Sequence, residues 1–510
     1  GVIFYGVSPK PVYLLIENGE GKLLPADEWW GKDTNETEDL CKEKYGKDAG
    51  IACIGPPGER QALLACIIND KGRAAGRSGL GAVMGSKRLK AVVAVGNQEV
   101  TMADPEGMAE AIQKHREVMK SVGMFGVLSE YGTAGITAGA VATGDAPIKN
   151  WAGTPKDFST AKKISDDAVI AIQRRKYACW RCPIGCGGET EVPEGKYAAK
   201  NHKPEYETLG TFGTMTLNDN VESINKANEI CNRAGLDTIS TGCTIAFAIE
   251  CFERGILTTE DTGGLQLTWG NHEAIVELTQ QIADGVGFGK VLQDGAKIGA
   301  ERIGRGSEEY AIHIAGEEVP MHDPRLNPGL AASYKMDATP ARHTQMSAWS
   351  VEGQFAPPGL YDKKVDRYDP KGKGKIYRLV SNHYHTSACA GLCMFGWSCL
   401  SADAICDCLT YTTGKQFTLE DVDRTGWRIA SLRMAFNIRE GVRNVDFQLP
   451  KRIIGQPPLE DGPLKGVTVD VDTQVQEYLE EMGWDTTTGA PKAETLKSLG
   501  LDFVCEQLSA

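Results

Sequence analysis

The residues with the clearest chemistry are three closely spaced cysteines, Cys179, Cys182 and Cys186. Their C-x₂-C-x₃-C spacing suits three corners of a [4Fe–4S] cluster, whose fourth thiolate would come from elsewhere in the chain. Zinc prefers paired C-x₂-C units or histidines, and no second pair follows at a suitable distance. Zinc and chance clustering are therefore the weaker alternatives, and the motif predicts a site that carries electrons one at a time.

A glycine-rich stretch, Gly72–Gly81, is a candidate for binding phosphate. Small residues let backbone amides approach an anion, and Arg73 and Arg77 would supply positive charge. On its own this pattern is also typical of an ordinary loop.

Other side chains with possible chemistry are less specific. Cys243 follows Ser-Thr-Gly and is expected to open an apolar helix, where the helix dipole would favour a thiolate; a small packed side chain is the alternative. His322, His383 and His385 are expected to satisfy local polar contacts. A basic run, 174–181, surrounds the first cysteine with four cations.

Length and composition limit the classes of protein. A chain of 510 residues is too long for one compact core and predicts two to four domains. The net charge of −13 argues against a protein that coats nucleic acid. The sequence has no apolar run near the ~20 residues of a membrane span. Fifteen cysteines, too sparse for a disulfide scaffold, and a start unlike a signal peptide predict a cytoplasmic protein with reduced thiols.

The elements that must position these residues change in character along the chain. Apolar runs predict strands over 10–16 and 89–95. Periodic apolar residues and capping signals predict helices over 37–45, from Asp104, and over 222–234, 244–254 and 418–439. The one low-complexity segment is 371–375. We expect an α+β fold with a β-rich domain over 1–103 and two mainly helical domains over 104–311 and 312–510.

Several ordered motifs resemble the tungsten-dependent aldehyde ferredoxin oxidoreductase family, which includes the related tungsten benzoyl-coenzyme A reductase catalytic subunits. The cysteine motif is joined by Ile54–Glu59, Asn69–Asp70, Arg73–Arg77, Gly81–Lys87, Pro204–Glu207, Gly235–Ser240, Asp323–Arg325 and Gly391–Cys393. The resemblance covers essentially the whole chain. Family members continue upstream of the position matching Gly1, so part of the β-rich domain is expected to precede this sequence.

The resemblance implies a tungsten ion between two pterin dithiolenes, bridged by Mg²⁺, and one [4Fe–4S] cluster. Its implied cluster ligands are Cys179, Cys182, Cys186 and Cys393; spacing alone leaves Cys389, Cys393 and Cys399 equal for the fourth place. The positions matched to cofactor binding are Arg73, Ala74, Gly76, Arg77, Asn232, Gly235, Leu236, Asp237, Thr238, Gly391 and Leu392. The carbonyl of Ala74 would bind Mg²⁺, and Cys243 could bind tungsten, as a cysteine does in the benzoyl-coenzyme A reductases.

The same resemblance assigns catalytic roles to two side chains. Glu207 matches a glutamate beside the metal, and His343 matches a histidine that faces the substrate. A shielded carboxylate can act as a base, and an imidazole can polarise a carbonyl. Two positions depart from the family, because Asn232 and Ala388 stand where an aspartate usually contacts a pterin.

The predicted function is oxidation of an aldehyde to a carboxylic acid, with electrons passing through the cluster to ferredoxin or another low-potential acceptor. One alternative is a dearomatising reductase of an aromatic thioester, supplied by an iron–sulfur electron-transfer subunit. Another is a relay subunit without a working metal centre. A homo- or hetero-oligomer is expected, with no nucleic-acid partner. Tungsten is the metal that the resemblance implies, and the sequence itself does not distinguish it from molybdenum.

Overall fold

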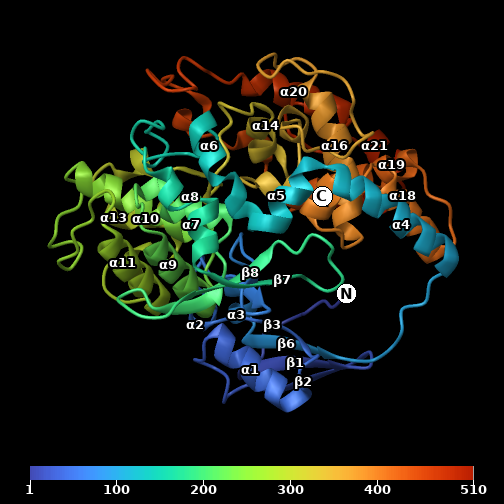
Figure 1. Cartoon of the computed structure of the whole chain (residues 1–510). Coiled ribbons are helices and arrows are strands. Elements are labelled where there is room, and N and C mark those ends of the chain that lie inside the picture. Colours follow the sequence, from blue (N-terminus) through green and yellow to red (C-terminus); the bar gives the residue numbers. More distant parts are fainter. Residues whose placement is uncertain (509–510) are drawn as a thin grey trace. The chain divides into compact units, whose positions relative to one another are not determined.

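The computed structural model describes residues 1–508, which form two compact units. The first unit comprises Gly1–Glu99, Tyr131–Val141 and Ala146–Met321, and the second comprises Val100–Glu130, Ala142–Asp145 and the chain from His322 onward (Figure 1). Within the described chain, the search for a helix long and apolar enough to cross a membrane found none.

The N-terminal part of the first unit is built on a mixed six-stranded sheet in the order β2-β1-β6-β3-β4-β5. The strands are β1 (Val12–Glu17), β2 (Glu20–Pro25), β3 (Gly50–Cys53), β4 (Ile67–Asn69), β5 (Arg73–Ala75) and β6 (Leu89–Val95). Only β1 and β6 pair in parallel, with Leu14 opposite Val92, and the other neighbours are antiparallel. The apolar side chains of Leu89, Ala91 and Val93 are buried at every second position of β6, although Lys90 between them is buried too, and this apolar run explains why the strand is recognisable in the sequence.

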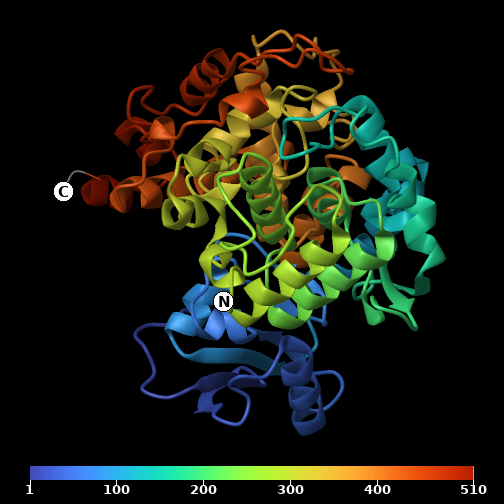
Figure 2. The same cartoon turned by 90° about the vertical axis from the view of Figure 1, so that its left-hand side faces the viewer.

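Helix α1 (Thr34–Tyr45) covers one side of this sheet (Figure 2). It begins with a capping box in which Asp33 accepts from the backbone N–H of Glu36 and Glu36 accepts from that of Asp33. Its Cys41 packs with Tyr13 and Val93 of the sheet in one buried cluster. Burial raises the pKa of the Cys41 thiol to about 12, so this cysteine packs as a small apolar residue.

The remainder of the first unit is mainly helical. Its helices are α2 (Pro56–Glu59), α3 (Leu80–Ser86), α6 (Thr137–Thr143), α7 (Asp166–Ala171), α8 (Tyr206–Phe212), α9 (Val221–Ala234), α10 (Thr238–Glu253), α11 (His272–Asp284), α12 (Gly289–Leu292) and α13 (Gly295–Ile303). Its further strands are β7 (Gln173–Tyr177), β8 (Gly187–Val192), β9 (Ala199–His202), β10 (His313–Ile314) and β11 (Glu317–Glu318). Helix α10 is buried along almost its whole length, as its apolar sequence requires.

The second unit is a helical assembly. Its helices are α4 (Pro105–Ser121), α5 (Gly123–Tyr131), α14 (Gly329–Met336), α15 (Trp349–Glu352), α16 (Lys373–Cys389), α17 (Met394–Cys399), α18 (Ala404–Thr413), α19 (Leu419–Arg439), α20 (Val471–Glu481), α21 (Ala493–Ser498) and α22 (Asp502–Leu508). Helices α16, α19 and α20 share a core in which the rings of Tyr377 and Tyr478 stack 3.9 Å apart.

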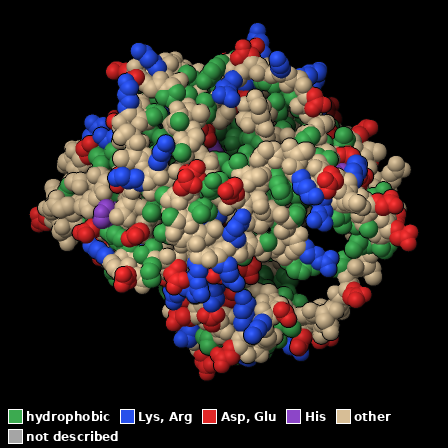
Figure 3. All heavy atoms as spheres, in the orientation of Figure 1, with side chains coloured by type: hydrophobic (Ala, Val, Ile, Leu, Met, Phe, Trp, Pro, Cys, Tyr) green, Lys and Arg blue, Asp and Glu red, His purple; other side chains and the backbone are tan. Residues whose placement is uncertain are grey.

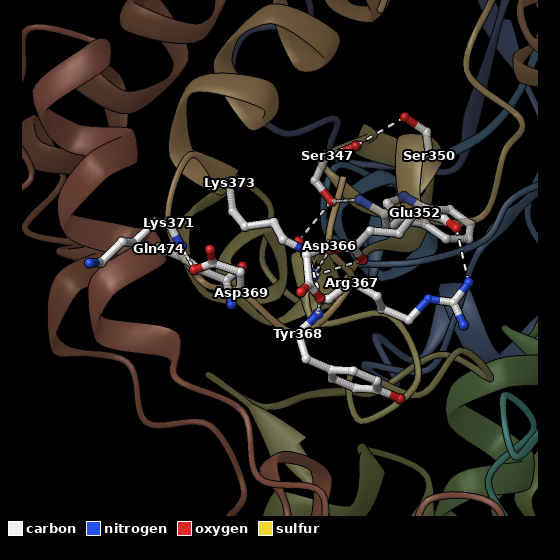
Figure 4. Close-up of polar contacts among 12 residues, drawn as sticks. Ser347, Ser350, Glu352, Asp366, Arg367, Tyr368, Asp369, Lys371, Lys373 and Gln474 are labelled. Carbon is white, nitrogen blue, oxygen red and sulfur yellow. Dashed lines mark hydrogen bonds and ion pairs between the residues drawn. The ribbon is translucent and has the colours of Figure 1, made fainter. Parts of the chain in front are cut away.

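A buried ion pair joins the two ends of the long connection between α15 and α16. Lys373 binds the Glu352 carboxylate, which also accepts the Gly329 N–H (Figure 4). The connection itself contributes Arg367, whose guanidinium donates to the Glu352 carbonyl over 3.0 Å. The predicted low-complexity linker over 371–375 is therefore wrong, because Lys373 begins a helix and its ammonium is buried.

The expected succession of a β-rich region and mainly helical regions is confirmed. Strand β6 matches its prediction, and helix α19 begins at the predicted capping box of Thr418 and Asp421. The helix expected over 244–254 begins six residues earlier, because the Asp237 carboxylate caps it. The domain boundaries expected after residues 103 and 311 remain a prediction.

Asp337 should contribute strongly to the stability of the second unit. It is buried, forms an ion pair with Arg433 at 3.0 Å, and has Nε2 of His385 at 3.6 Å. Burial alone would raise its pKa, but Arg433 and His385 hold it well below the ordinary value. We expect Asp337→Asn to lower the free energy of unfolding by about 3 kcal/mol, as measured by urea denaturation at neutral pH.

The sign of the pH dependence follows from the depressed pKa. The stabilisation is complete above the unfolded carboxyl pKa of about 3.9 and is lost as the pH falls further. Asp423→Asn is a matched control, because its 2.7 Å pair with Arg378 is partly solvated and should cost less than about 1 kcal/mol. Equal losses for the two variants would contradict the prediction.

Candidate functional site

The first part of the glycine-rich stretch, through Ala75, belongs to a hairpin rather than to an open loop. Strands β4 and β5 pair with Asn69 opposite Arg73 and Ile68 opposite Ala74, and their turn contains two left-handed residues, Asp70 and Lys71. This pairing fixes the Arg73 side chain at the start of β5, so a rigid element presents the first arginine of the motif.

After this hairpin, Arg77 contacts two carboxylates, that of Glu317 and that of Asp237 in the segment that follows α9. Its Nε lies 2.9 Å from a Glu317 carboxylate oxygen and 3.7 Å from one of Asp237. A side chain at Gly76 would meet the same Asp237 carboxylate at 3.7 Å. The fold thus brings together two motifs that are far apart in the sequence, and two carboxylates already balance the buried charge of Arg77.

The turn between α9 and α10 is fixed by backbone geometry. Gly235 is left-handed with φ 74°, and its carbonyl accepts the N–H of Cys66 at 2.8 Å. Leu236 bridges to Ala65, and Asp237 caps α10 by accepting the amides of Ile239 and Ser240. Thr238, the first residue of α10, donates to or accepts from the Thr208 hydroxyl at 2.9 Å. Asn232, in the last turn of α9, is buried with its carbonyl bound by the Thr34 hydroxyl.

The three cysteines occupy the loop of a second hairpin. Strands β7 and β8 pair with Tyr177 opposite Gly187, and the loop between them carries Cys179, Cys182 and Cys186. The Cys182 N–H donates to the Cys179 carbonyl at 3.0 Å. None of the three is buried: Cys179 is exposed, and Cys182 and Cys186 are half-buried.

Arg73 links the two hairpins. Its guanidinium lies over the Tyr177 ring, 5.3 Å from the centroid, and forms an ion pair with Glu205 at 3.3 Å. Burial lowers its pKa, but nearby Tyr177, Glu205, Cys179 and Cys186 raise that pKa overall, because each can carry negative charge.

The residues around Arg73 fit an anionic group. Four buried polar atoms have no hydrogen-bond partner among the described residues: Nε and Nη2 of Arg73, the Tyr177 hydroxyl and Nε2 of His202. The Tyr177 and His202 rings meet edge to face at 5.6 Å. Gly72 has no space for a side chain, since a Cβ would lie 2.4 Å from His202. The Arg73 and Tyr177 atoms are buried donors without acceptors beside three thiols, which suits a negatively charged cluster or a phosphate. Nε2 of His202 is not a donor, because the Nδ1–H of this ring donates to the Lys203 carbonyl and burial lowers the pKa of the imidazole.

Glu207 lies in the first turn of α8, two residues after the Arg73 partner Glu205. Its Oε2 accepts the Met321 N–H at 2.9 Å, and the adjacent Tyr206 hydroxyl donates to the Met321 carbonyl. The half-buried Glu207 carboxylate and the adjacent Tyr206 hydroxyl thus both bind the backbone of Met321, and these two contacts fix the position of the carboxylate.

Cys243 does not lie at a helix start, and the expectation of free amides around it is wrong. It is the sixth residue of α10, buried, and its thiol donates to the Val319 carbonyl at 3.7 Å. Burial raises its pKa well above the usual value, and the nearby Glu318 carboxyl raises it further. The protein around Cys243 thus favours the neutral thiol.

In the second unit, His343 belongs to an aromatic row, defined as His322, His343, Trp349 and Phe355. His343 begins a short 3₁₀ turn, and its ring lies 5.1 Å from that of His322 and 6.5 Å from that of Trp349. Trp349 meets Phe355 edge to face at 4.3 Å. The row places an imidazole beside flat apolar surfaces.

The candidate fourth cluster ligand also belongs to the second unit. Gly391 has φ 89°, Leu392 packs in the core cluster around Trp397, and Cys393 is exposed at the N-cap of α17. Cys399 is buried and Cys389 is exposed. Of the three candidates for the fourth cluster ligand, only Cys399 is therefore buried. The assignment of Cys393 as that ligand remains a prediction.

The sequence did not single out several residues that the structure places near these groups. Asp145 has a carboxylate oxygen 2.7 Å from Nδ1 of His322, whereas the sequence predicted only a local polar contact for this histidine. Glu318 is buried near Arg77 and Cys243, and burial raises its pKa to about 7. Only the pattern Pro204–Glu207 pointed to Glu205, and nothing in the sequence pointed to Asp145.

Comparisons with known proteins agree with these motifs. The profile "Aldehyde ferredoxin oxidoreductase, N-terminal domain" matches residues 1–96, and "Aldehyde ferredoxin oxidoreductase, domains 2 & 3" matches residues 107–501. A tungsten-containing aldehyde ferredoxin oxidoreductase of Pyrococcus abyssi is 34% identical, covering 98% of this chain and 82% of its own. The aliphatic sulfonate oxidoreductase, WOR-like subunit, of Pyrococcus furiosus is 30% identical, covering 98% and 80%.

A solved structure shares the fold. The active site complex BamBC of benzoyl coenzyme A reductase superposes with a TM-score of 0.78 at 24% identity, covering 98% of this chain and 81% of that one. Because both domain profiles match in order and the relatives align over nearly all of its length, this chain is an oxidoreductase that belongs to the aldehyde ferredoxin oxidoreductase family.

Proposed function

We propose that this protein oxidises aldehydes to carboxylic acids and passes the electrons through one [4Fe–4S] cluster to ferredoxin or another low-potential carrier. The observation that carries the proposal is the arrangement around Arg73, where one half-buried guanidinium joins the glycine-rich hairpin, the cysteine hairpin and the segment leading to Glu207. Relatives named as tungsten-containing aldehyde ferredoxin oxidoreductases at 34% identity support the same activity.

Membership of this family implies a tungsten-bound pterin and an iron–sulfur cluster. The pterin would be held by Arg73, Ala74, Gly76 and Arg77, by Asn232, Gly235, Leu236, Asp237 and Thr238, and by Gly391 and Leu392, with Mg²⁺ at the Ala74 carbonyl. The cluster would be held by Cys179, Cys182, Cys186 and Cys393. When bound, these groups supply a two-electron oxidant for the carbonyl carbon and a one-electron outlet.

The chain itself contributes proton handling. Oxidation of an aldehyde with water releases two protons and two electrons for each carboxylic acid formed. Glu207 takes a proton, and the Met321 N–H that its Oε2 accepts holds the carboxylate in position. His343 donates a hydrogen bond that polarises the substrate carbonyl, and Trp349 and Phe355 limit the access of water to it.

A dearomatising reductase is the second candidate, and Cys243 is the residue that favours it. The Cys243 thiol is buried and neutral in the protein alone, so a metal bound by it would have to displace both its proton and its hydrogen bond to the Val319 carbonyl. Wild-type protein should reduce a viologen dye when given an aldehyde. Oxidation of reduced dye that needs an aromatic thioester would favour the reductase.

We place the electron outlet at the loop of the cysteine hairpin. Trp180, between Cys179 and Cys182, is 86% exposed, and Arg181 stacks on its ring at 4.8 Å. The expected positive patch of Arg174 and Arg175 is weaker than the sequence suggests, because β8 pairs them with Glu191 and Glu189. Figure 3 shows lysine and arginine side chains gathered in this part of the first unit.

The first prediction from this proposal concerns the cluster. Cys182→Ser should remove most of the iron, because a hydroxyl is a hard and poorly ionised substitute for a thiolate. Iron analysis and the reduced-state EPR spectrum measure the change. Cys251→Ser is the control, since this buried thiol lies inside α10 and should leave the iron content unchanged. A full iron content in the Cys182 variant would show that the ligand assignment is wrong.

The second prediction concerns the proposed base. Glu207→Gln preserves size and the hydrogen bond from Met321 but cannot exchange a proton, so turnover should fall roughly 10²-fold or more. Tungsten and iron contents should stay at the wild-type level, and the loss should appear in kcat rather than KM. Turnover near that of the wild type in a metal-replete variant would exclude Glu207 from the mechanism.

The third prediction concerns the electron outlet. Trp180→Ala should slow reduction of an acidic ferredoxin about 10-fold, because an exposed aromatic side chain is a typical anchor of a docking surface. Reduction of a small viologen dye should not change. Tyr368→Ala, a half-exposed aromatic residue in the second unit, is the control. Equal slowing with both acceptors would assign Trp180 to the integrity of the cluster loop instead.

A further inference from the structure

Lys203 is a buried cation of the first unit that the proposed chemistry does not use. It directly follows β9, and only 1% of its surface is exposed. Its backbone N–H donates to the Gly188 carbonyl at 2.7 Å, and its Nζ donates to the Tyr131 carbonyl at 2.7 Å. Within residues 1–508, the ammonium has this one hydrogen bond and no ion pair. A neutral carbonyl does not balance the charge of a buried ammonium.

The charged groups around Lys203 do not compensate it fully. Glu205 lies two residues further along the chain, but its carboxylate is already paired with Arg73 at 3.3 Å. Burial lowers the pKa of the Lys203 ammonium, and nearby Glu205 and Cys186 oppose this shift only in part. The cations Lys176 and Arg73 lower the pKa further. A buried ammonium in such surroundings is costly unless a bound anion lies near it.

The ammonium lies beside the third cysteine of the cluster motif. Gly132 has φ 69°, and a Cβ at this position would lie 2.9 Å from Nζ of Lys203 and 2.6 Å from the carbonyl oxygen of Cys186. The ammonium and the Cys186 backbone are therefore neighbours across Gly132. Gly188 also leaves room for the lysine, because a Cβ there would lie 3.3 Å from its Cδ. Two glycines thus make space for a lysine that reaches the cysteine hairpin.

We propose that Lys203 compensates the charge of the [4Fe–4S] cluster and raises its reduction potential. A cluster bound by four thiolates is an anion, and it gains one more negative charge when it is reduced. A buried cation nearby stabilises the reduced form more than the oxidised form, because the protein interior screens charge weakly. The cluster takes up one electron from the substrate oxidation and passes it to the carrier, while Lys203 stays protonated throughout. The inference rests on the proposed function for the cluster ligands, but not on the oxidation of aldehydes.

The test is a redox titration of the iron-replete Lys203→Met protein, followed by the EPR signal of the reduced cluster at one fixed pH. Methionine has a similar length and volume but no charge. The equilibrium between oxidised and reduced cluster should shift about tenfold toward the oxidised form, which is a decrease of about 59 mV for a one-electron couple. The iron content should stay at the wild-type level. Lys203→Gln, a second neutral variant, should shift the potential in the same direction.

The matched control is Lys200→Met, which removes an exposed lysine of β9 three residues earlier in the chain. Water and salt screen the charge of an exposed lysine, so this variant should leave the redox equilibrium within about twofold of the wild type. The difference between the wild type and Lys203→Met should persist when the salt concentration is raised, because a buried charge is screened much less than an exposed one.

The titration separates this inference from the proposed activity. An unchanged potential in iron-replete Lys203→Met protein would overturn the inference, as would an equal shift in Lys200→Met. Loss of iron from both Lys203→Met and Lys203→Gln would also overturn it, because the lysine would then hold the cysteine hairpin together rather than set the potential. If the wild-type protein oxidises no aldehyde but its cluster shows the expected shift, the proposed activity fails while the role of Lys203 is retained.

Discussion

The guanidinium of Arg73 is the contact around which the first unit organises its chemistry. It extends from a strand of the glycine-rich hairpin, covers the ring of Tyr177 at the base of the cysteine hairpin, and pairs with Glu205 just before α8. Three segments far apart in the sequence are thereby held together by one charge. Buried guanidinium nitrogens without acceptors, here Nε and Nη2, are costly unless an anion binds them, so the contact that fixes the geometry also selects for an anionic ligand.

Buried ion pairs recur in both units. Arg77 meets Glu317 and Asp237, Lys373 meets Glu352, and Arg325 meets Asp323. Replacing such pairs by apolar residues would often be neutral for stability, so their value here is positional. The pair of Lys373 and Glu352 closes a long connection next to Trp349, while Arg77 holds the start of α10 against the glycine-rich motif. Rigid placement of this kind is what proton and electron transfer require, because both depend steeply on distance.

Two histidines show that the contacts of a residue depend on which segments packing brings next to it. His343 was identified through its resemblance to a family position, whereas His322 was expected to make only a local polar contact. The structure places them side by side and gives His322 a carboxylate partner from the short segment Ala142–Asp145. No periodicity or spacing links Asp145 to His322, because the contact depends on how the chain returns after more than a hundred intervening residues.

The sequence by itself determined the elements whose signals are local. The alternating strand β6, the capping box of α19 and the glycine that ends α9 need only their neighbours along the chain, and the C-x₂-C-x₃-C motif needs only its own spacing. The tertiary structure alone decided which charges are buried and what faces them. It buried Cys243 within α10, paired Arg174 with Glu191, and brought Asp145 into contact with His322. Burial and charge pairing arise between segments that only packing brings together, so the local sequence carries no signal for them.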